Sequence, residues 1–282
     1  GSSSMDRASD FGEALSNFLI EKELQGCTPK TLKHYRHVLT SFVADLGDPV
    51  RPYLLTYLHT LGQRISQVSV ASHARSIKAF LRWCHVEGYC EDVRFPRIRC
   101  PETAPKGPAV NEVRSLLRSR SNNFEGRRDT AIISLVYDTG MRLRELHSLT
   151  IDDVNLREGF CLVYGKGSKE RYVPFGRKAG RALWRYLKDR NRAAGHEGPL
   201  WVSRDGRDLS FGGITNIFRR FGINAHKFRH AFALAYIDNG GDAITLQRIL
   251  GHTTLEMTAR YVRYSTGTIK RQHARHSPAD RI

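Results

Sequence analysis

The stretch His226-Lys227-Phe228-Arg229-His230, followed downstream by Leu250-Gly251-His252 and by Tyr261, organises the interpretation of the whole chain. His226 and Arg229 stand three residues apart, so on a helix they share a face and can address one small target. The buried side of that helix is predicted from Phe228, Phe232, Ala235 and Tyr236. Gly251 is predicted to end a second short helix and to leave His252 at an exposed turn. A guanidinium, two imidazoles and a phenol near one point suit an anion that is to be attacked, with phosphate as the first candidate.

The length and charge of the chain indicate two domains and a polyanionic partner. Its 282 residues are enough for two ordinary domains, each with its own core. The formal net charge of +17 favours nucleic acid over a membrane surface, because the apolar face of a membrane-lying helix is not evident. A basic protein from an arginine-rich genome is the plain alternative for this charge.

Cysteine usage and the start of the chain bear on the compartment. The five cysteines are odd in number and form no C-x-x-C pair, which is typical of reduced thiols rather than of disulfides or zinc ligands. Residues 1–4, before Met5, are interpreted as a cloning remnant and not as a signal peptide. No apolar run approaches the roughly 20 residues of a membrane span. We therefore expect a cytoplasmic, nucleoid-associated protein with no membrane partner.

Residues 5–95 are predicted to form a helical domain of four helices. Thr28 is a typical N-cap before Pro29, and apolar positions recur at helical spacing in every segment. Basic residues form two stripes opposite the apolar faces: Lys30 and Lys33 with His37, and Arg75, Lys78 and Arg82. A solvated helix face explains one such stripe, but two on the same module favour contact with a phosphate backbone.

Residues 96–108 are predicted to be a linker, because prolines and basic residues replace the helical periodicity. A loop inside a single domain is the alternative. Residues 109–282 are then a second domain, in which Asn111 caps a helix that ends near Arg118 and a further helix spans 127–138. Thr139-Gly140 ends that helix, which places Arg142 at a turn from which a long side chain can be aimed into a cleft.

The middle of the second domain carries the strand signals. Phe160–Tyr164 and Arg171–Pro174 are predicted to form a hairpin whose tip, residues 165–170, is rich in glycine and lysine. Helices are expected at about 176–193 and 211–221, with a short strand near residues 200–202 between them. The tail from Ser265 is polar and basic, so it is expected either to be disordered or to dock on a partner. The predicted fold class is mainly α with a small antiparallel β-sheet.

Two common kinds of site are excluded by spacing. Gly165-Lys166-Gly167-Ser168 does not form a nucleotide-binding loop, because the preceding Gly159 is one residue too far away and no helix follows. His226 and His230 have the i, i+4 spacing of zinc ligands, but the glutamate of H-E-x-x-H and an obvious third ligand are missing. We expect neither a metal nor another cofactor.

Taken together, these motifs resemble the tyrosine recombinases of the phage integrase family over nearly the whole chain. Residues 139–146 look like the segment with the first catalytic arginine, here Arg142, and residues 165–171 look like the hairpin with the catalytic lysine, here Lys166. Residues 226–230 correspond to H-x-L-R-H with Phe228 in place of leucine, which supplies His226 and Arg229. The L-G-H element supplies His252, and Tyr261 lies nine residues on, where the family keeps its nucleophile. The resemblance also implies a helical, SAM-like core-binding domain in front of a mixed α/β catalytic domain.

The resemblance implies a mechanism that needs neither metal nor ATP. Tyr261 would attack a DNA phosphodiester to give a 3′-phosphotyrosine and a free 5′-hydroxyl, which conserves the bond energy. Arg142 and Arg229 would hold the non-bridging oxygens, and His252 would donate a hydrogen bond to them. His226 would accept the phenolic proton and Lys166 would protonate the departing oxygen. Glu145 and His230 are interpreted as orienting residues.

The same resemblance implies partners and leaves rival functions open. Members of that family clamp a double-stranded recombination site between two domains. They act as a homodimer on one site and as a homotetramer in synapsis, and they exchange a C-terminal segment, which here would be the residues after Ser265. A simple Xer-like or transposon-resolution recombinase fits better than an arm-binding integrase. The alternatives are a type IB topoisomerase-like nicking-closing enzyme, which would relax supercoils without strand exchange, and a non-catalytic DNA-binding regulator, which would form no covalent adduct.

Overall fold

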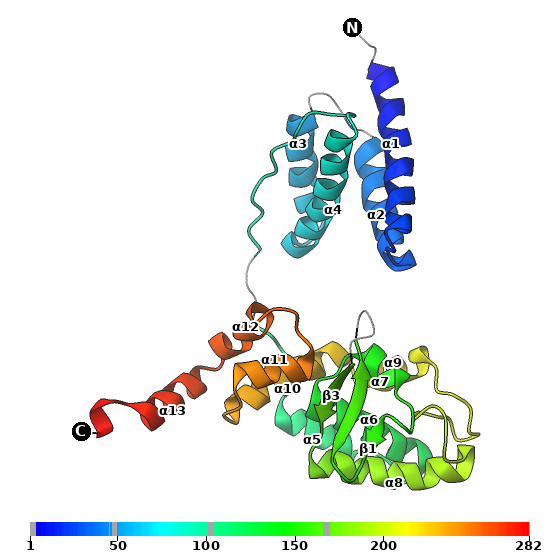
Figure 1. The fold of residues 1–282 in the computed structure, drawn as a ribbon, viewed down its shortest axis with the longest axis vertical. Helices are drawn as coiled ribbons and strands as arrows, with labels where there is room; N and C mark the ends of the chain where they lie inside the picture. Colours follow the sequence, from blue (N-terminus) through cyan, green and yellow to red (C-terminus); the bar gives the residue numbers. More distant parts are fainter. Residues whose placement is uncertain (1–3, 45, 47–49, 101–103, 166–169, 282) are drawn as a thin grey trace. The chain divides into compact units, whose positions relative to one another are not determined.

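The chain divides into two compact units, Gly1–Thr103 and Ala104–Ile282, which are described separately (Figure 1). The computed structural model describes residues 4–44, 46, 50–100, 104–165 and 170–281. The division falls within residues 96–108, which the sequence predicts to be a linker. The predicted fold class, mainly helical with one small antiparallel sheet, is confirmed.

The first unit consists of four helices around one apolar core. Its helices are α1 (Ser4–Leu24), α2 (Pro29–Ala44), α3 (Val50–Gly62) and α4 (Gln67–Val86). The helix α2 begins as expected, because the Thr28 hydroxyl accepts the Thr31 N–H at 3.3 Å. Phe18 stands at the centre of the core, where its ring meets those of Tyr35 and Phe80 edge to face. The four amphipathic helices therefore bury one face each and leave the other to solvent.

The two basic stripes lie on the outward faces of α2 and α4. Every one of the predicted DNA-contacting side chains is exposed: Lys30, Lys33, Arg75, Lys78 and Arg82. Buried neighbours on the same helices, Leu39 on α2 and Ile77 on α4, face the core instead. The amphipathic pattern thus keeps all five charged groups available to a partner.

The second unit is built from helices around a three-stranded sheet. Before the sheet come α5 (Val110–Arg118), α6 (Phe124–Thr139) and α7 (Leu143–Ser148). The sheet has the order β1 (Val154–Asn155), β2 (Phe160–Tyr164), β3 (Glu170–Pro174), with both pairs antiparallel and Cys161 opposite Val173. After it follow α8 (Arg177–Ala194), α9 (Phe211–Arg219), α10 (Ala225–Asp238), α11 (Ala243–Leu250), α12 (Glu256–Tyr264), α13 (Thr266–His276) and a 3₁₀ turn, η1 (Ala279–Arg281).

Helix α6 is the centre of this unit, and it explains how the site is held. It packs against α8 and α10, and its residues Ile132 and Val136 are fully buried. Gly140 then takes the left-handed conformation at φ 60° and ends the helix. A Cβ at that position would lie 2.4 Å from the Phe232 ring, so the turn between α6 and α7 needs glycine to stay close to α10.

Several element boundaries differ from the sequence expectation for local reasons. Asn111 does not cap α5; Ala109 is the N-cap, and its N–H is bound by the Glu112 carboxylate at 2.6 Å. Helix α6 begins at Phe124 rather than at residue 127, because Asn123 accepts the Gly126 N–H. Near residues 200–202 only isolated bridges form, Thr150 with Pro199 and Val202 with Asp208.

The tail after Ser265 is helical, and its docking on a partner stays a prediction. Its residues form α13, which contacts both α10 and α12. Lys270, His273 and His276 on this helix are exposed, so its contacts with α10 and α12 bury little of it.

Candidate active site

Arg142 stands at the N-cap of α7, directly after the Gly140 turn. Its N–H donates to the Glu145 carboxylate at 2.7 Å, and its guanidinium donates to the same carboxylate at 2.9 Å and to the Gly251 carbonyl at 3.3 Å. The side chain is 44% exposed. The guanidinium is therefore held at its inner edge while the rest faces outward, where a ligand can reach it.

Glu145 is the buried anion behind this arginine. Arg171 of β3 donates to both of its carboxylate oxygens, at 2.9 and 2.7 Å, and to the Ile249 carbonyl at 2.9 Å. Although burial alone would raise it, these hydrogen bonds and the one from the Arg142 N–H hold the pKa of Glu145 below its ordinary value. Glu145 thus ties α7, β3 and the end of α11 together, in line with its predicted orienting role.

Arg229 joins the ends of two helices. It lies on α10, is only 3% exposed, and donates to the Gly140 carbonyl at 2.7 Å and to the Leu250 carbonyl at 2.8 Å. Both carbonyls belong to helix C-termini, where backbone acceptors lack intrahelical partners. Burial, and then the charge of Arg142, lower the pKa of Arg229 to about 10, so the guanidinium stays charged at neutral pH.

Tyr261 is buried in the same site and is held by an imidazole. The hydroxyl of Tyr261, on α12, lies 2.8 Å from His230 Nδ1, and its ring is 2% exposed. His226 is the next ring along, with its centroid 4.5 Å from that of His230. Burial raises the pKa of Tyr261, whereas Arg260 and Arg229 oppose that rise. The phenol therefore remains protonated at neutral pH until a base takes its proton.

His252 follows the left-handed turn at Gly251 and faces Tyr261 from the other side. The two rings are nearly parallel with centroids 6.5 Å apart, and His252 Nδ1 lies 2.8 Å from the Thr258 hydroxyl. Burial, followed by the charges of Arg229 and Arg142, lowers the pKa of His252 to about 4. The ring is therefore neutral at neutral pH, with Thr258 fixing one nitrogen and leaving the other for a ligand.

The electrostatics of the site favour an anion. Burial and nearby cations also lower the pKa of His226, and the pKa of His230 falls to about 4, with burial and then His226 as the main causes. Arg260 joins the cations, with its guanidinium 5.5 Å from the centre of the Tyr261 ring. Three guanidiniums beside three neutral imidazoles and a phenol form a site that attracts a phosphate and can remove a proton.

The structure brings five of the six predicted catalytic residues together: Arg142, His226, Arg229, His252 and Tyr261. Lys166, the sixth, lies outside the described residues. The sequence interpretation did not single out Arg171, Thr258 or Arg260. In the sequence, Arg171 was marked only by lying next to the predicted hairpin tip, and Thr258 and Arg260 only by lying near Tyr261. Each of the three acts through contacts that form only when the chain folds.

Within the described residues no group of three or more His, Cys, Asp or Glu side chains could hold a metal ion. Nor does any helix of the described segments have the length and apolar character to cross a membrane.

Comparisons with known proteins give a consistent result. The model of the phage integrase family matches residues 109–267. The chain is similar to the tyrosine recombinase XerC of Histophilus somni, with 31% identity over 87% of this chain and 89% of that protein, and to XerD of Staphylococcus epidermidis, with 31% identity over 94% and 98%. Its fold is like that of a lambda integrase dimer bound to a COC′ core site, with a TM-score of 0.71, 17% identity, and coverage of 89% and 94%.

Proposed function

The chain belongs to the phage integrase family, and from this premise we propose that it is a site-specific recombinase whose nucleophile is Tyr261. As a tyrosine recombinase it is an enzyme that breaks and rejoins DNA strands. The observation that carries the residue assignment is the burial of the Tyr261 phenol among Arg229, Arg260 and the imidazoles of His230 and His252.

The chemistry of the first step follows from these positions. The Tyr261 oxygen attacks the phosphorus of a phosphodiester, the bond from phosphorus to the 5′-oxygen breaks, and a 3′-phosphotyrosine forms. The phenolic proton leaves through the imidazole pair: His230 Nδ1 lies 2.8 Å from the Tyr261 hydroxyl, and His226 stands next to His230 as the acceptor predicted from the sequence. Reversal of the step by a 5′-hydroxyl of another strand rejoins the DNA.

The cations act on the charge that grows in the transition state. Arg142 offers its exposed edge to the non-bridging oxygens, and Arg229 adds a fixed positive charge behind it. We assign the Thr258 hydroxyl as the donor to Nδ1 of His252, which leaves Nε2 with the ring hydrogen to donate to the phosphate. We assign to Lys166, from its place in the sequence motif, the protonation of the departing 5′-oxygen.

The contacts of the first unit with DNA and the oligomeric state are part of the same proposal. The exposed stripes with Lys30, Lys33, Arg75, Lys78 and Arg82 would hold the phosphate backbone from the first unit, as a core-binding domain before a catalytic domain. A homodimer on one site is supported by the similar lambda integrase, which is a dimer on its core site. We extend this to a homotetramer in synapsis and to a cytoplasmic, nucleoid-associated location, where the substrate lies.

A topoisomerase-like nicking-closing activity is not favoured by the relatives, which are recombinases by name. The two activities separate in one experiment. A recombinase joins strands between two duplexes that carry its site, and a topoisomerase relaxes supercoils without exchanging strands. Covalent capture from a random-sequence DNA library would first identify the cleaved site.

Removal of the Tyr261 oxygen tests the assignment of the nucleophile. Tyr261→Phe should abolish covalent adducts on a nicked substrate that carries the captured site, while binding to that site stays within about twofold, because only the attacking atom is lost. Tyr264→Phe, on the same helix, is the matched control and should form adducts at the wild-type rate. Adducts from Tyr261→Phe together with loss of adducts from Tyr264→Phe would move the nucleophile to Tyr264.

A further inference from the structure

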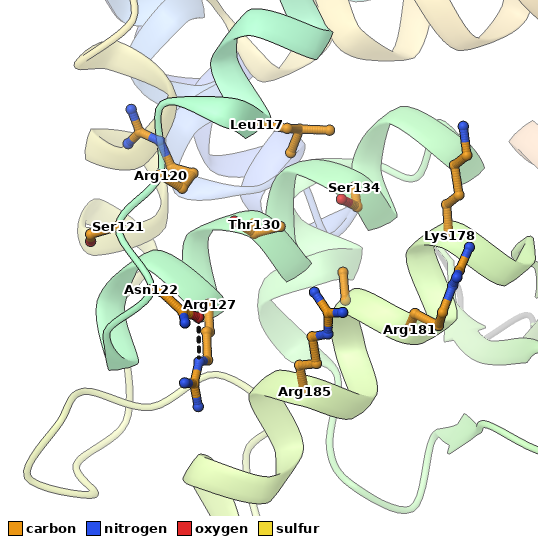
Figure 2. Close-up of a pocket in the computed structure, with 11 residues that line it drawn as sticks. Leu117, Arg120, Ser121, Asn122, Arg127, Thr130, Ser134, Lys178, Arg181 and Arg185 are labelled. Carbon is orange, nitrogen blue, oxygen red and sulfur yellow. Dashed lines mark hydrogen bonds between the residues drawn. The ribbon is translucent and has the colours of Figure 1, made fainter.

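A hollow lined by cations lies on the catalytic unit outside the candidate active site. It has a volume of about 450 Å³ and is formed by α8, α6 and the segment that follows α5 (Figure 2). Its charged lining residues are all basic: Arg120, Arg127, Lys178, Arg181 and Arg185. The hydroxyls of Thr130 and Ser134 on α6 also line it. The hollow therefore offers hydrogen-bond donors and positive charge, the features of an anion site.

The cations fall into two groups that differ in how they are held. Arg127 is paired with Asp189 at 2.8 Å, and the Arg120 guanidinium lies 4.0 Å from the centre of the Phe221 ring, so both are fixed by the protein. Lys178, Arg181 and Arg185 are exposed and form no ion pair with any described residue. We call these three the α8 cation row. Their charge is available to a ligand from outside the chain.

The spacing of the α8 cation row suits a phosphate backbone. Its members follow one another at three and four residues along α8, which is about 4.5 and 6 Å along the helix axis, and Figure 2 shows all three rising from the same helix. A DNA strand carries one negative charge per roughly 3.4 Å of duplex axis. The three cations therefore span the axial length of about three phosphates. Arg181 also lines a neighbouring hollow together with Arg177, the residue before Lys178 at the start of α8.

This surface is separated from the candidate active site by the core of the unit. The site takes its described side chains from the start of α7, from β3, from α10 and from the region of α11 and α12. Helix α6 packs against both α8 and α10, and Figure 1 draws α8 along the lower edge of the unit, with α11 and α12 at its upper left. A duplex seated over Tyr261 is therefore not the one that the α8 cation row contacts.

We propose that the α8 cation row is a second nucleic-acid binding surface, which holds the backbone of a duplex other than the one being cut. This goes beyond strand cleavage, which uses none of these residues. Duplex DNA is favoured over an acidic protein because a protein interface is anchored by buried aromatic and apolar side chains. Apart from Leu117 and Ala182, the lining of this hollow is polar or charged.

A two-duplex retention assay with the full chain tests the proposal. The protein is loaded on a bead-tethered duplex that carries its site, unbound protein is washed away, and a fluorescent 20-base-pair duplex of unrelated sequence is added. The wild type should retain the second duplex. The variant Lys178→Gln/Arg181→Gln/Arg185→Gln should retain about tenfold less of it than the wild type near 0.1 M salt. The slope of log K against log[salt] for the second duplex should fall by about 2.7, at 0.9 per lost contact.

The matched control removes the same charge elsewhere on the unit. Arg192→Gln/Arg204→Gln/Arg207→Gln changes three exposed cations that do not line the hollow and should retain the second duplex like the wild type. In the test variant, binding to the first duplex and adduct formation should stay within about twofold of the wild type. These two measurements distinguish failure of the second binding surface from failure of the proposed recombinase function. Equal retention by both variants, no retention by the wild type, or an equal loss for the first duplex would each overturn the proposal. Absence of retention by the wild type would redirect attention to an acidic protein partner.

Discussion

Arg142 and Arg229 carry the same charge but differ in what they hold. Arg142 is half exposed and its inner edge is shared between Glu145 and the Gly251 carbonyl. Arg229 is buried and donates one hydrogen bond each to the carbonyls of Gly140 and Leu250. The first is placed to meet a ligand, and the second also holds the ends of α6 and α11 together.

Replacement of each arginine by lysine separates these two roles. Arg142→Lys and Arg229→Lys should both slow adduct formation by about 10²- to 10³-fold. In Arg142→Lys an ammonium cannot present two parallel donors to a phosphate, and in Arg229→Lys the fixed positive charge behind Arg142 is displaced. Only Arg229→Lys should also lower the free energy of unfolding, by about 2 kcal/mol, because a buried carbonyl is left without a donor. Single-turnover kinetics and urea denaturation measure the two effects. An equal loss of stability in both variants would contradict the different roles.

The imidazoles predict a loss of stability on acidification. The pKa values of His230 and His252 are about 4 in the folded chain, below the ordinary value near 6.5, so the unfolded chain binds more protons between these limits. The free energy of unfolding should therefore fall as the pH drops from 6.5 to 4 and be insensitive to these groups above that window. Urea denaturation of His252→Asn across pH 4.5 to 7.5 should show a shallower dependence than the wild type. His196→Asn, at an exposed ring, should follow the wild type, and parallel curves for all three proteins would refute the assignment.

Among elements, the sequence predicted those that local chemistry determines. The helix with His226 and Arg229 followed from its apolar period, and the turn at Gly251 followed from glycine's preference for the left-handed conformation. The role of Arg171 could not be predicted, because it depends on β3 approaching the end of α11, far away in the sequence. The two-residue strand β1 was missed for the same reason, since only its pairing with β2 defines it. The tail helix α13 was not predicted, because the polar and basic sequence of the tail carries no clear apolar period.

The turn that ends α11 can be tested by adding one methyl group. Gly251 has φ 63°, and a Cβ there would lie 3.1 Å from the Arg171 guanidinium that holds Glu145. Gly251→Ala should cost about 1 to 2 kcal/mol of unfolding free energy from backbone strain and should also slow adduct formation by displacing Arg171. Gly222→Ala is the matched control, since Gly222 has φ 64° but open space around its Cβ position. It should show the same strain with unchanged cleavage; equal cleavage by both variants would mean that Arg171 does not position the site.

At the scale of the whole molecule, the charge of +17 is distributed over surfaces with different proposed tasks. The guanidiniums of the active site are partly neutralised by Glu145, whereas the stripes of the first unit are exposed. A generally basic composition would place cations without regard to function. The proposed grip on DNA instead requires that particular cations contact phosphates, and this difference can be measured through counterion release.

The salt dependence of binding to the captured site distinguishes these alternatives. The slope of log K against log[salt] should be strongly negative for the wild type, and it should become less negative by about 0.9 for each phosphate contact removed. Lys33→Gln and Arg75→Gln, one on each stripe, should therefore each change the slope by about one and the double variant by about two. Arg64→Gln removes an exposed cation of the same unit that belongs to neither stripe and should leave the slope unchanged. If all these variants shift the slope equally, the charge acts as a diffuse field and the stripes are solvated helix faces; if only the stripe variants do, the first unit contacts the phosphate backbone through α2 and α4.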